Sequence, residues 1–207
     1  MKIIILATIA ALVGDSARAG AIQKGALKVT VCLKRIGNPV PIYHARSIAS
    51  EMYSEIGVKI DWRSSGCSYK EPDAVIIELT DDTPATLLSG ALAYALPYER
   101  VHIRVFLDRV RDAVGPDVEP YLLAHVLAHE IGHILQGVSQ HSETGIMKAR
   151  WTSEDYKRMV VNPLPFTEED VRLIHSGVEG RAVRLLAANA HEEAARLPSV
   201  QSKNSSH

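Results

Sequence analysis

Two histidines and a glutamate within one short stretch have the residue types and the spacing needed to bind and use a metal ion. The stretch His129-Glu130-Ile131-Gly132-His133 is an HExxH pattern. On a helix, residues i and i+4 lie one turn apart on the same face, so both imidazoles can reach one ion. Zinc suits imidazole nitrogen, and a catalytic zinc site keeps one coordination position open for water. Glu130 could then act on that water as a general base.

A third ligand is expected outside this pattern, because catalytic zinc usually has three protein ligands. His141 is the preferred candidate, since Gly137 can adopt the left-handed conformation that ends a helix and turns the chain back. The competing candidates are glutamates farther along the chain: Glu154, Glu168 and Glu169. The alternative to a metal site is a helix whose histidines only make hydrogen bonds.

The HExxH pattern lies in a stretch that predicts a helix over 120–136. Pro120 stands at its start and Gly137 directly follows its end, as helix boundaries favour. His125 lies one turn before His129. We expect it to pack in the core or to orient a ligand rather than to bind the ion itself.

The chain before this helix alternates between strand and helix patterns. Residues 27–34 and 58–63 are predicted strands, and 41–56 has apolar residues at helical spacing. This order predicts a β-α-β unit with parallel strands and a right-handed crossover. Further strands are predicted at 74–79, 91–96 and 101–107. The fold class is therefore α/β (α+β), with a mixed, twisted sheet.

The C-terminal part is predicted to be helical. Residues 152–155 could cap a short helix, and a longer helix is expected from Thr167 to about Ser176. The segment after Gly180 is rich in Ala, Arg and Glu and predicts an outlying helix with a loose tail. We therefore expect one domain over 20–179 and a helical extension with a flexible tail over 180–207.

The stretch from His129 to Met147 resembles the metzincin peptidases. In that family HExxH is followed by Gly, by a third His, and by a tight turn that carries Met beneath the metal. Gly137, His141 and residues 145–147 occupy those places here. More narrowly, the chain resembles an uncharacterised group of bacterial secreted proteins with HExGH, then HSxxGIM, then Arg-Trp. Arg150-Trp151 and the later Pro165-Phe166-Thr167 match that group.

This resemblance implies a metzincin-like (zincin) fold with an active-site helix, a Met-turn at Met147 and a C-terminal helix. It also implies a zinc peptidase that binds its substrate in extended form along an edge strand, for which 91–98 or 101–107 is the candidate. The spacing departs from the family pattern. Gly137 lies four residues after His133, and His141 lies four after Gly137, where the family has three and three.

The start of the chain has the pattern of an export signal. Lys2 precedes an apolar run over 3–13, and Ala17-Arg18-Ala19 fits the small-x-small rule for cleavage. The apolar run is shorter than the roughly 20 residues that cross a hydrocarbon core. We therefore expect a signal peptide over 1–19, a secreted or periplasmic mature protein that begins at Gly20, and no stable membrane insertion after cleavage.

Two cysteines, Cys32 and Cys67, are present in the expected mature chain. An even number of cysteines in an exported protein favours a disulfide between them. Two free thiols or metal ligands are the alternatives. The segment from Gly20 to Ala26 is too short to cover a cleft, so latency through a cysteine switch is not expected.

Composition argues against a nucleic-acid partner. The 23 Lys and Arg residues nearly balance the 24 Asp and Glu residues, and aromatic residues make up only 5%. A basic surface or a stacking platform for bases is therefore not indicated. With 207 residues, 46% of them hydrophobic, the chain can bury the core of one domain, and we expect a monomer.

These patterns together predict a secreted zinc metallopeptidase that hydrolyses peptide bonds, with Glu130 as general base and His129, His133 and His141 as ligands. One alternative is a zinc amidohydrolase that acts on cell-wall peptide. Another is a secreted zinc-binding protein without catalysis, against which the intact Glu130 argues. The candidate donors to the oxyanion are Tyr98, Tyr121 and Tyr156.

Overall fold

The computed structural model describes residues 27–35, 40–64, 74–84, 90–95 and 101–196. The expected signal peptide and Cys67 lie outside these residues, so the signal and the disulfide stay predictions. Cys32 itself is fully buried on the first strand. Within the described part of the chain, no helix is both long and apolar enough to span a membrane.

A five-stranded mixed sheet forms the centre of the fold. Its strands are β1 (Leu27–Arg35), β2 (Val58–Arg63), β3 (Val75–Thr80), β4 (Ala93–Ala95) and β5 (His102–Phe106), in the order β2-β1-β3-β5-β4. β1 is parallel to β2 and to β3, β3 is parallel to β5, and only β4 runs antiparallel. The expected mixed sheet and β-α-β unit are confirmed, with α1 (Val40–Glu55) as the crossover helix.

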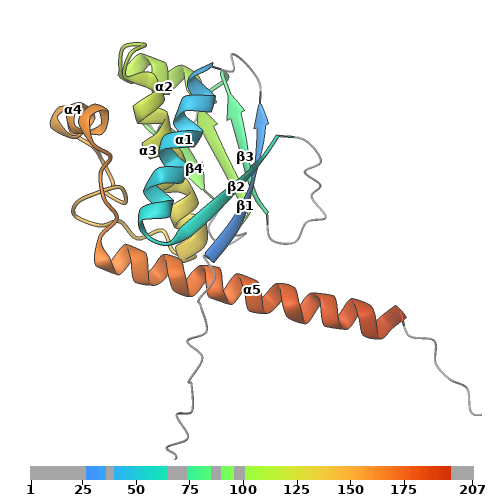
Figure 1. Ribbon diagram of the computed structural model, residues 1–207. Helices are drawn as coiled ribbons and strands as arrows, with labels where there is room; N and C mark the ends of the chain where they lie inside the picture. Colours follow the sequence, from blue (N-terminus) through green and yellow to red (C-terminus); the bar gives the residue numbers. More distant parts are fainter. Residues whose placement is uncertain (1–26, 36–39, 65–73, 85–89, 96–100, 197–207) are drawn as a thin grey trace, which may run out of the picture.

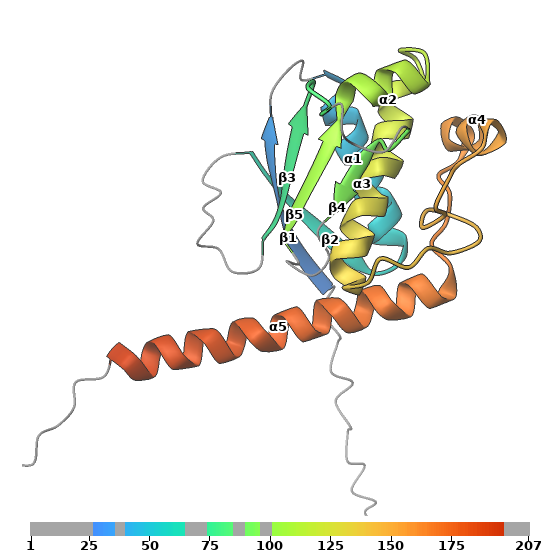
Figure 2. The same cartoon turned by 180° about the vertical axis from the view of Figure 1, so that it is seen from behind.

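Two helices cover one face of this sheet and form the main core with it. α1 and α3 (Glu119–Gln136) lie side by side against the sheet in both views (Figures 1 and 2). Apolar residues at helical spacing face inward, and fifteen of the eighteen residues of α3 are buried. The hydroxyl of Tyr53 on α1 donates a 2.8 Å hydrogen bond to the carbonyl of Ala128. That bond fixes the backbone directly before His129.

One helix was missed by the sequence prediction. α2 (Leu107–Ala113) starts directly after β5, where the pattern predicted a strand as far as Leu107. Its inward-facing residues are only Leu107 and Val110, so the apolar period was too short to stand out from the preceding strand. The predicted strand 91–96 is also shorter, because β4 spans three residues.

The C-terminal region forms two helices. α4 (Ser153–Val161) begins with a capping box between Thr152 and Asp155, at the place where the sequence predicted a cap. α5 (Glu168–Arg196) is one continuous helix of 29 residues, whereas the sequence predicted two helices separated near Gly180. Figure 1 shows its second half extending beyond the sheet.

Gly177 lets α5 approach the end of α3 closely. A Cβ atom at Gly177 would lie 1.7 Å from the carbonyl oxygen of Leu135, which no packed structure tolerates. At Gly180, the nearest atom to such a Cβ is the flexible Arg184 Nη1 at 3.5 Å. The close approach of Leu135 therefore requires glycine at position 177, whereas no such approach requires glycine at position 180.

Gly177→Ala is expected to lower the free energy of unfolding by about 3 kcal/mol, because the helices must separate. Gly180→Ala is the matched control and should be neutral or stabilising by up to about 1 kcal/mol, since Ala favours helix. Chemical denaturation of both variants would measure the difference. Equal stabilities for the two variants would show that α5 does not pack on α3 in this way.

Candidate metal centre

Three histidine side chains meet at one point between α3 and the loop that follows it. His129 Nε2 lies 3.0 Å from His133 Nε2, which in turn lies 3.3 Å from His141 Nε2. One ligand atom from each of the three lies within 4.8 Å of the others, and no other such group of potential metal ligands occurs among the described residues. The structure thus brings together the three residues that the sequence analysis selected.

The loop after α3 carries His141 back over the helix despite its two additional residues. Gly137 ends α3 with φ 70° and ψ 20°, and its N–H donates to the carbonyl of His133. This is the left-handed end that the sequence predicted. Beyond His141, the N–H of Ser142 donates to Met147 O at 2.8 Å, and the Ser142 hydroxyl donates to Asp170 Oδ1 at 2.8 Å.

Backbone carbonyls orient the two helical histidines. His129 Nδ1 lies 2.8 Å from Ile146 O, and His133 Nδ1 lies 3.0 Å from Val138 O. A carbonyl only accepts hydrogen bonds, so each Nδ1 carries the proton and each Nε2 has a free lone pair. Two such lone pairs 3.0 Å apart repel each other unless a cation lies between them.

The donor set fits zinc. Nitrogens around a tetrahedral zinc ion at a Zn–N distance of about 2.0–2.1 Å lie roughly 3.3–3.4 Å apart, close to the separations seen here. Metal binding also requires neutral imidazoles. Burial, reinforced by His133, lowers the pKa of His129 to about 3, and burial likewise lowers the pKa of His133. Both rings are therefore neutral at physiological pH.

Glu130 lies beside the triad with its carboxyl group largely removed from solvent. It is 8% exposed and lines the same cleft as His129 and His141. Burial raises the pKa of Glu130 to about 8. With that pKa the carboxyl group is mostly protonated at neutral pH in the metal-free chain. The positive charge of an ion held by the three histidines would favour the carboxylate, which is the form that can accept a proton.

A cleft of about 480 Å³ opens over the triad. Its lining includes the segment 90–93, which leads into β4, and the segment 148–151 with Tyr156. β4 pairs only with β5 in the described sheet, whereas β5 lies between β3 and β4. Of the two candidate edge strands, the structure therefore places the first at the cleft and the second inside the sheet.

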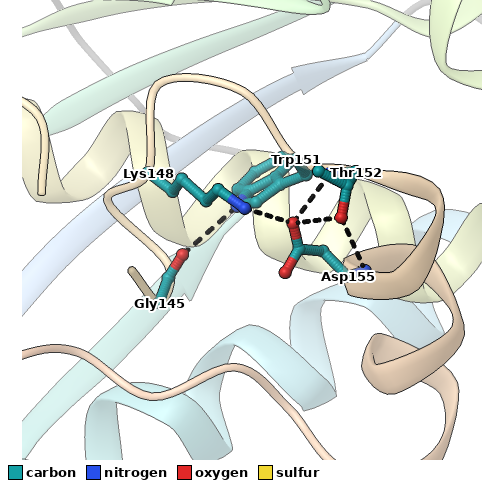
Figure 3. Close-up of polar contacts among 5 residues, drawn as sticks. All are labelled: Gly145, Lys148, Trp151, Thr152 and Asp155. Carbon is teal, nitrogen blue, oxygen red and sulfur yellow. Dashed lines mark hydrogen bonds and ion pairs between the residues drawn. The ribbon is translucent and has the colours of Figure 1, made fainter. Parts of the chain in front are cut away.

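Trp151 forms part of the cleft wall next to the candidate metal ligands. Its ring lies 5.4 Å from that of His129 and 6.2 Å from that of His125, both edge-on. The indole Nε1–H donates to Gly145 O at 3.3 Å, as Figure 3 shows. From the sequence, Trp151 was interpreted as a residue of the core or of the cleft wall, and the structure places it in the cleft wall.

His125 packs in the core and is not part of the group of three converging histidines. Its Nδ1–H donates to Tyr121 O at 2.7 Å, and its Nε2 accepts from the N–H of Leu164 at 3.0 Å. Both ring nitrogens are therefore occupied, and burial lowers the pKa of His125 to about 4. The side chain connects α3 to the segment before α5.

Met147 is fully buried beneath the helix face that carries the histidines. A Cβ atom at Gly132 would lie 2.6 Å from Met147 Sδ, so the glycine inside HExGH makes room for the sulfur. The turn before it uses Gly145 at φ 77°, where a Cβ would lie 2.2 Å from Pro165 O. Both glycines are thus explained by close approaches that the sequence pattern does not reveal.

None of the other candidate ligands, Glu154, Glu168 and Glu169, joins the three histidines in a metal-binding group of the described residues, and Glu168 is exposed. Glu154 is exposed and pairs with Lys157 on α4, and Glu169 is exposed and pairs with Arg172. Of the candidate tyrosines, Tyr156 lines the cleft. Tyr121 packs against His44 with ring centroids 5.5 Å apart, and Tyr98 lies outside the described residues. Asp170 is buried, and it bonds locally with Thr167 at the start of α5. Its contact with the Ser142 hydroxyl was missed, because that contact joins segments far apart in the sequence.

Comparison with known proteins supports the fold. No family model matches the chain, and no curated protein sequence matches it. Among solved structures, archaemetzincin from Methanopyrus kandleri is similar, with a TM-score of 0.53 and 18% sequence identity. The match covers 76% of this chain and 99% of that one. The metzincin-like fold expected from the sequence is therefore confirmed.

Proposed function

We propose that this protein is a zinc-dependent peptidase that hydrolyses peptide bonds in an extended substrate. The observation that carries the proposal is the convergence of three imidazole nitrogens beside the buried Glu130 in an open cleft. A zinc-binding protein without catalysis has no need of a buried carboxyl group at this place. The likeness to archaemetzincin adds the matching fold.

Each side chain of the site has its own role in the proposed hydrolysis. His129, His133 and His141 would hold the ion through their Nε2 atoms. Zinc held there would supply a Lewis acid that activates water and polarises the substrate carbonyl. Glu130 takes the proton from the attacking water and returns it to the departing amine. Tyr156 is the candidate donor to the developing oxyanion, because it lines the cleft.

The edge of the sheet is the proposed platform for the substrate backbone. β4 is paired on one side only within the described sheet, and the segment leading into it lines the cleft. An extended peptide can add to such an edge through main-chain hydrogen bonds. We further propose that the mature protein is exported, as residues 1–19 predict, and meets its peptide substrates outside the cytoplasm.

The test is the metal content and the peptidase activity of the mature chain from Gly20. We expect one zinc ion per chain, cleavage of a peptide library, loss of cleavage on chelation and recovery on adding zinc. N-terminal sequencing of the exported protein would locate the signal cleavage site. Zinc binding without any cleavage would contradict the peptidase proposal, and absence of bound metal would contradict the metal site as well.

A further inference from the structure

Arg150 places a positive charge at the cleft that no acidic side chain of the described structure neutralises. The side chain is exposed and lines the cleft together with His129, Glu130 and His141. Within the described residues it makes no ion pair and no hydrogen bond. A guanidinium has five N–H donors and remains charged at any physiological pH.

The second cation of the cleft is already paired. Lys148 Nζ lies 2.7 Å from Asp155 Oδ2, and the two side chains are only 28% and 14% exposed. Asp155 Oδ2 also accepts from the N–H and the hydroxyl of Thr152 (Figure 3). Asp155 is thus engaged by its own helix cap and by Lys148, and it leaves Arg150 with the uncompensated charge.

Side-chain contacts fix the residues on both sides of Arg150. Two positions before it, Lys148 donates a hydrogen bond to Asp155, and directly after it, the indole of Trp151 donates to Gly145 O. Thr152 then begins the capping box of α4. A short segment with anchors at each end presents its exposed side chain to the cleft at a defined place, which reduces the ordering cost of binding.

We propose that Arg150 is a specificity-determining residue that binds a carboxylate of the peptide substrate close to the bond that is cut. The inference rests on the proposed peptidase function and names its substrate class, peptides that carry a carboxylate near the bond that is cut. Glu130 is the only carboxyl group among the described residues that line the cleft, and it is buried. A substrate carboxylate can therefore approach the unpaired guanidinium without repulsion from an exposed carboxylate in the cleft lining. The carboxylate can belong to an acidic side chain or to the peptide C-terminus.

The test compares cleavage of matched peptides by the zinc-loaded mature protein. One set carries Glu or Gln at each position around the scissile bond, and a second set has a free or an amidated C-terminus. We expect kcat/KM to be about tenfold higher for the acidic member at one position, the size of a charge-assisted contact of about 1.4 kcal/mol. The position of the preference distinguishes a side-chain carboxylate from a terminal one.

Arg150→Gln should bring this ratio close to one without loss of zinc, while Arg150→Lys should retain part of it. Arg158→Gln is the matched control, because Arg158 is exposed on α4 and does not line the cleft. It should keep the full ratio. The preference should also shrink at high ionic strength, because a partly exposed ion pair is screened by salt.

A binding measurement separates this inference from the proposed function. Fluorescence anisotropy would compare two labelled hexapeptide pools that differ only in carrying Glu or Gln. Tighter binding of the Glu pool that is lost in Arg150→Gln would support the carboxylate site even if no peptide were cut. Cleavage without a preference for a carboxylate in either peptide set, or a preference that survives Arg150→Gln, would overturn the inference and leave the peptidase function standing.

Discussion

Replacing Glu130 with glutamine is expected to lower kcat/KM by about a thousandfold while zinc stays bound, because general acid–base catalysis contributes a factor of this order. The amide has nearly the same shape as the carboxyl group but cannot accept the proton of water. Glu130 is not among the three converging ligands, so the metal site should be unchanged. Steady-state kinetics on a cleavable peptide, together with metal analysis, would measure both effects.

The stability of the Glu130→Gln variant provides an internal check. Burial raises the pKa of Glu130 to about 8, so the folded state disfavours its charged form, and a neutral amide should not destabilise the apo protein. Glu143→Gln is a suitable control, because Glu143 is exposed on the loop after α3 and does not line the cleft. Full activity in the Glu130→Gln variant would rule out the proposed general base.

Removing either His129 or His141 should reduce zinc affinity by well over 100-fold, which exceeds the effect of losing an outer-shell hydrogen bond. Each substitution by alanine takes away one of three Nε2 donors and leaves an incomplete site. Competition with a chromophoric chelator would give the dissociation constants. Activity should fall together with the bound zinc.

His125→Gln is the control on the same helix, since His125 uses both ring nitrogens for hydrogen bonds within the protein. It should retain zinc at full stoichiometry. If zinc were retained in His141→Ala but lost in His129→Ala, the third ligand would lie elsewhere. A glutamate such as Glu154 would then have to leave its exposed position on α4, where it pairs with Lys157.

Local rules of the chain account for much of the site. The i, i+4 spacing of His129 and His133 on a helix with an apolar face requires no tertiary information, because helix geometry alone brings the two rings together. The left-handed turn at Gly137 follows equally from the freedom of glycine at positive φ. The β-α-β unit and the capping box at Thr152 were likewise predicted from short-range patterns.

Other features depend on residues far apart in the sequence. The length of α5 was missed because Gly177 and Gly180 resemble a helix break, whereas Gly177 is there to let α5 pack on Leu135. The position of β4 at the sheet edge was undecided in the sequence, because strand order depends on pairing and not on the pattern within one strand.

The sequence by itself determined His129 and His133 as candidate ligands and the helix that carries them, since both follow from residue type and helical period. It favoured His141 as the third ligand but left later glutamates as alternatives. Only the tertiary structure decided which polar residues of the chain face the cleft. Ile146 O accepts a hydrogen bond from His129 and orients its ring. The N–H of Leu164 donates to His125 Nε2, which occupies that nitrogen within the protein. Asp155 pairs with Lys148 and leaves Arg150 free of an acidic partner among the described residues. Such pairings depend on contacts between separate segments, which no local spacing encodes.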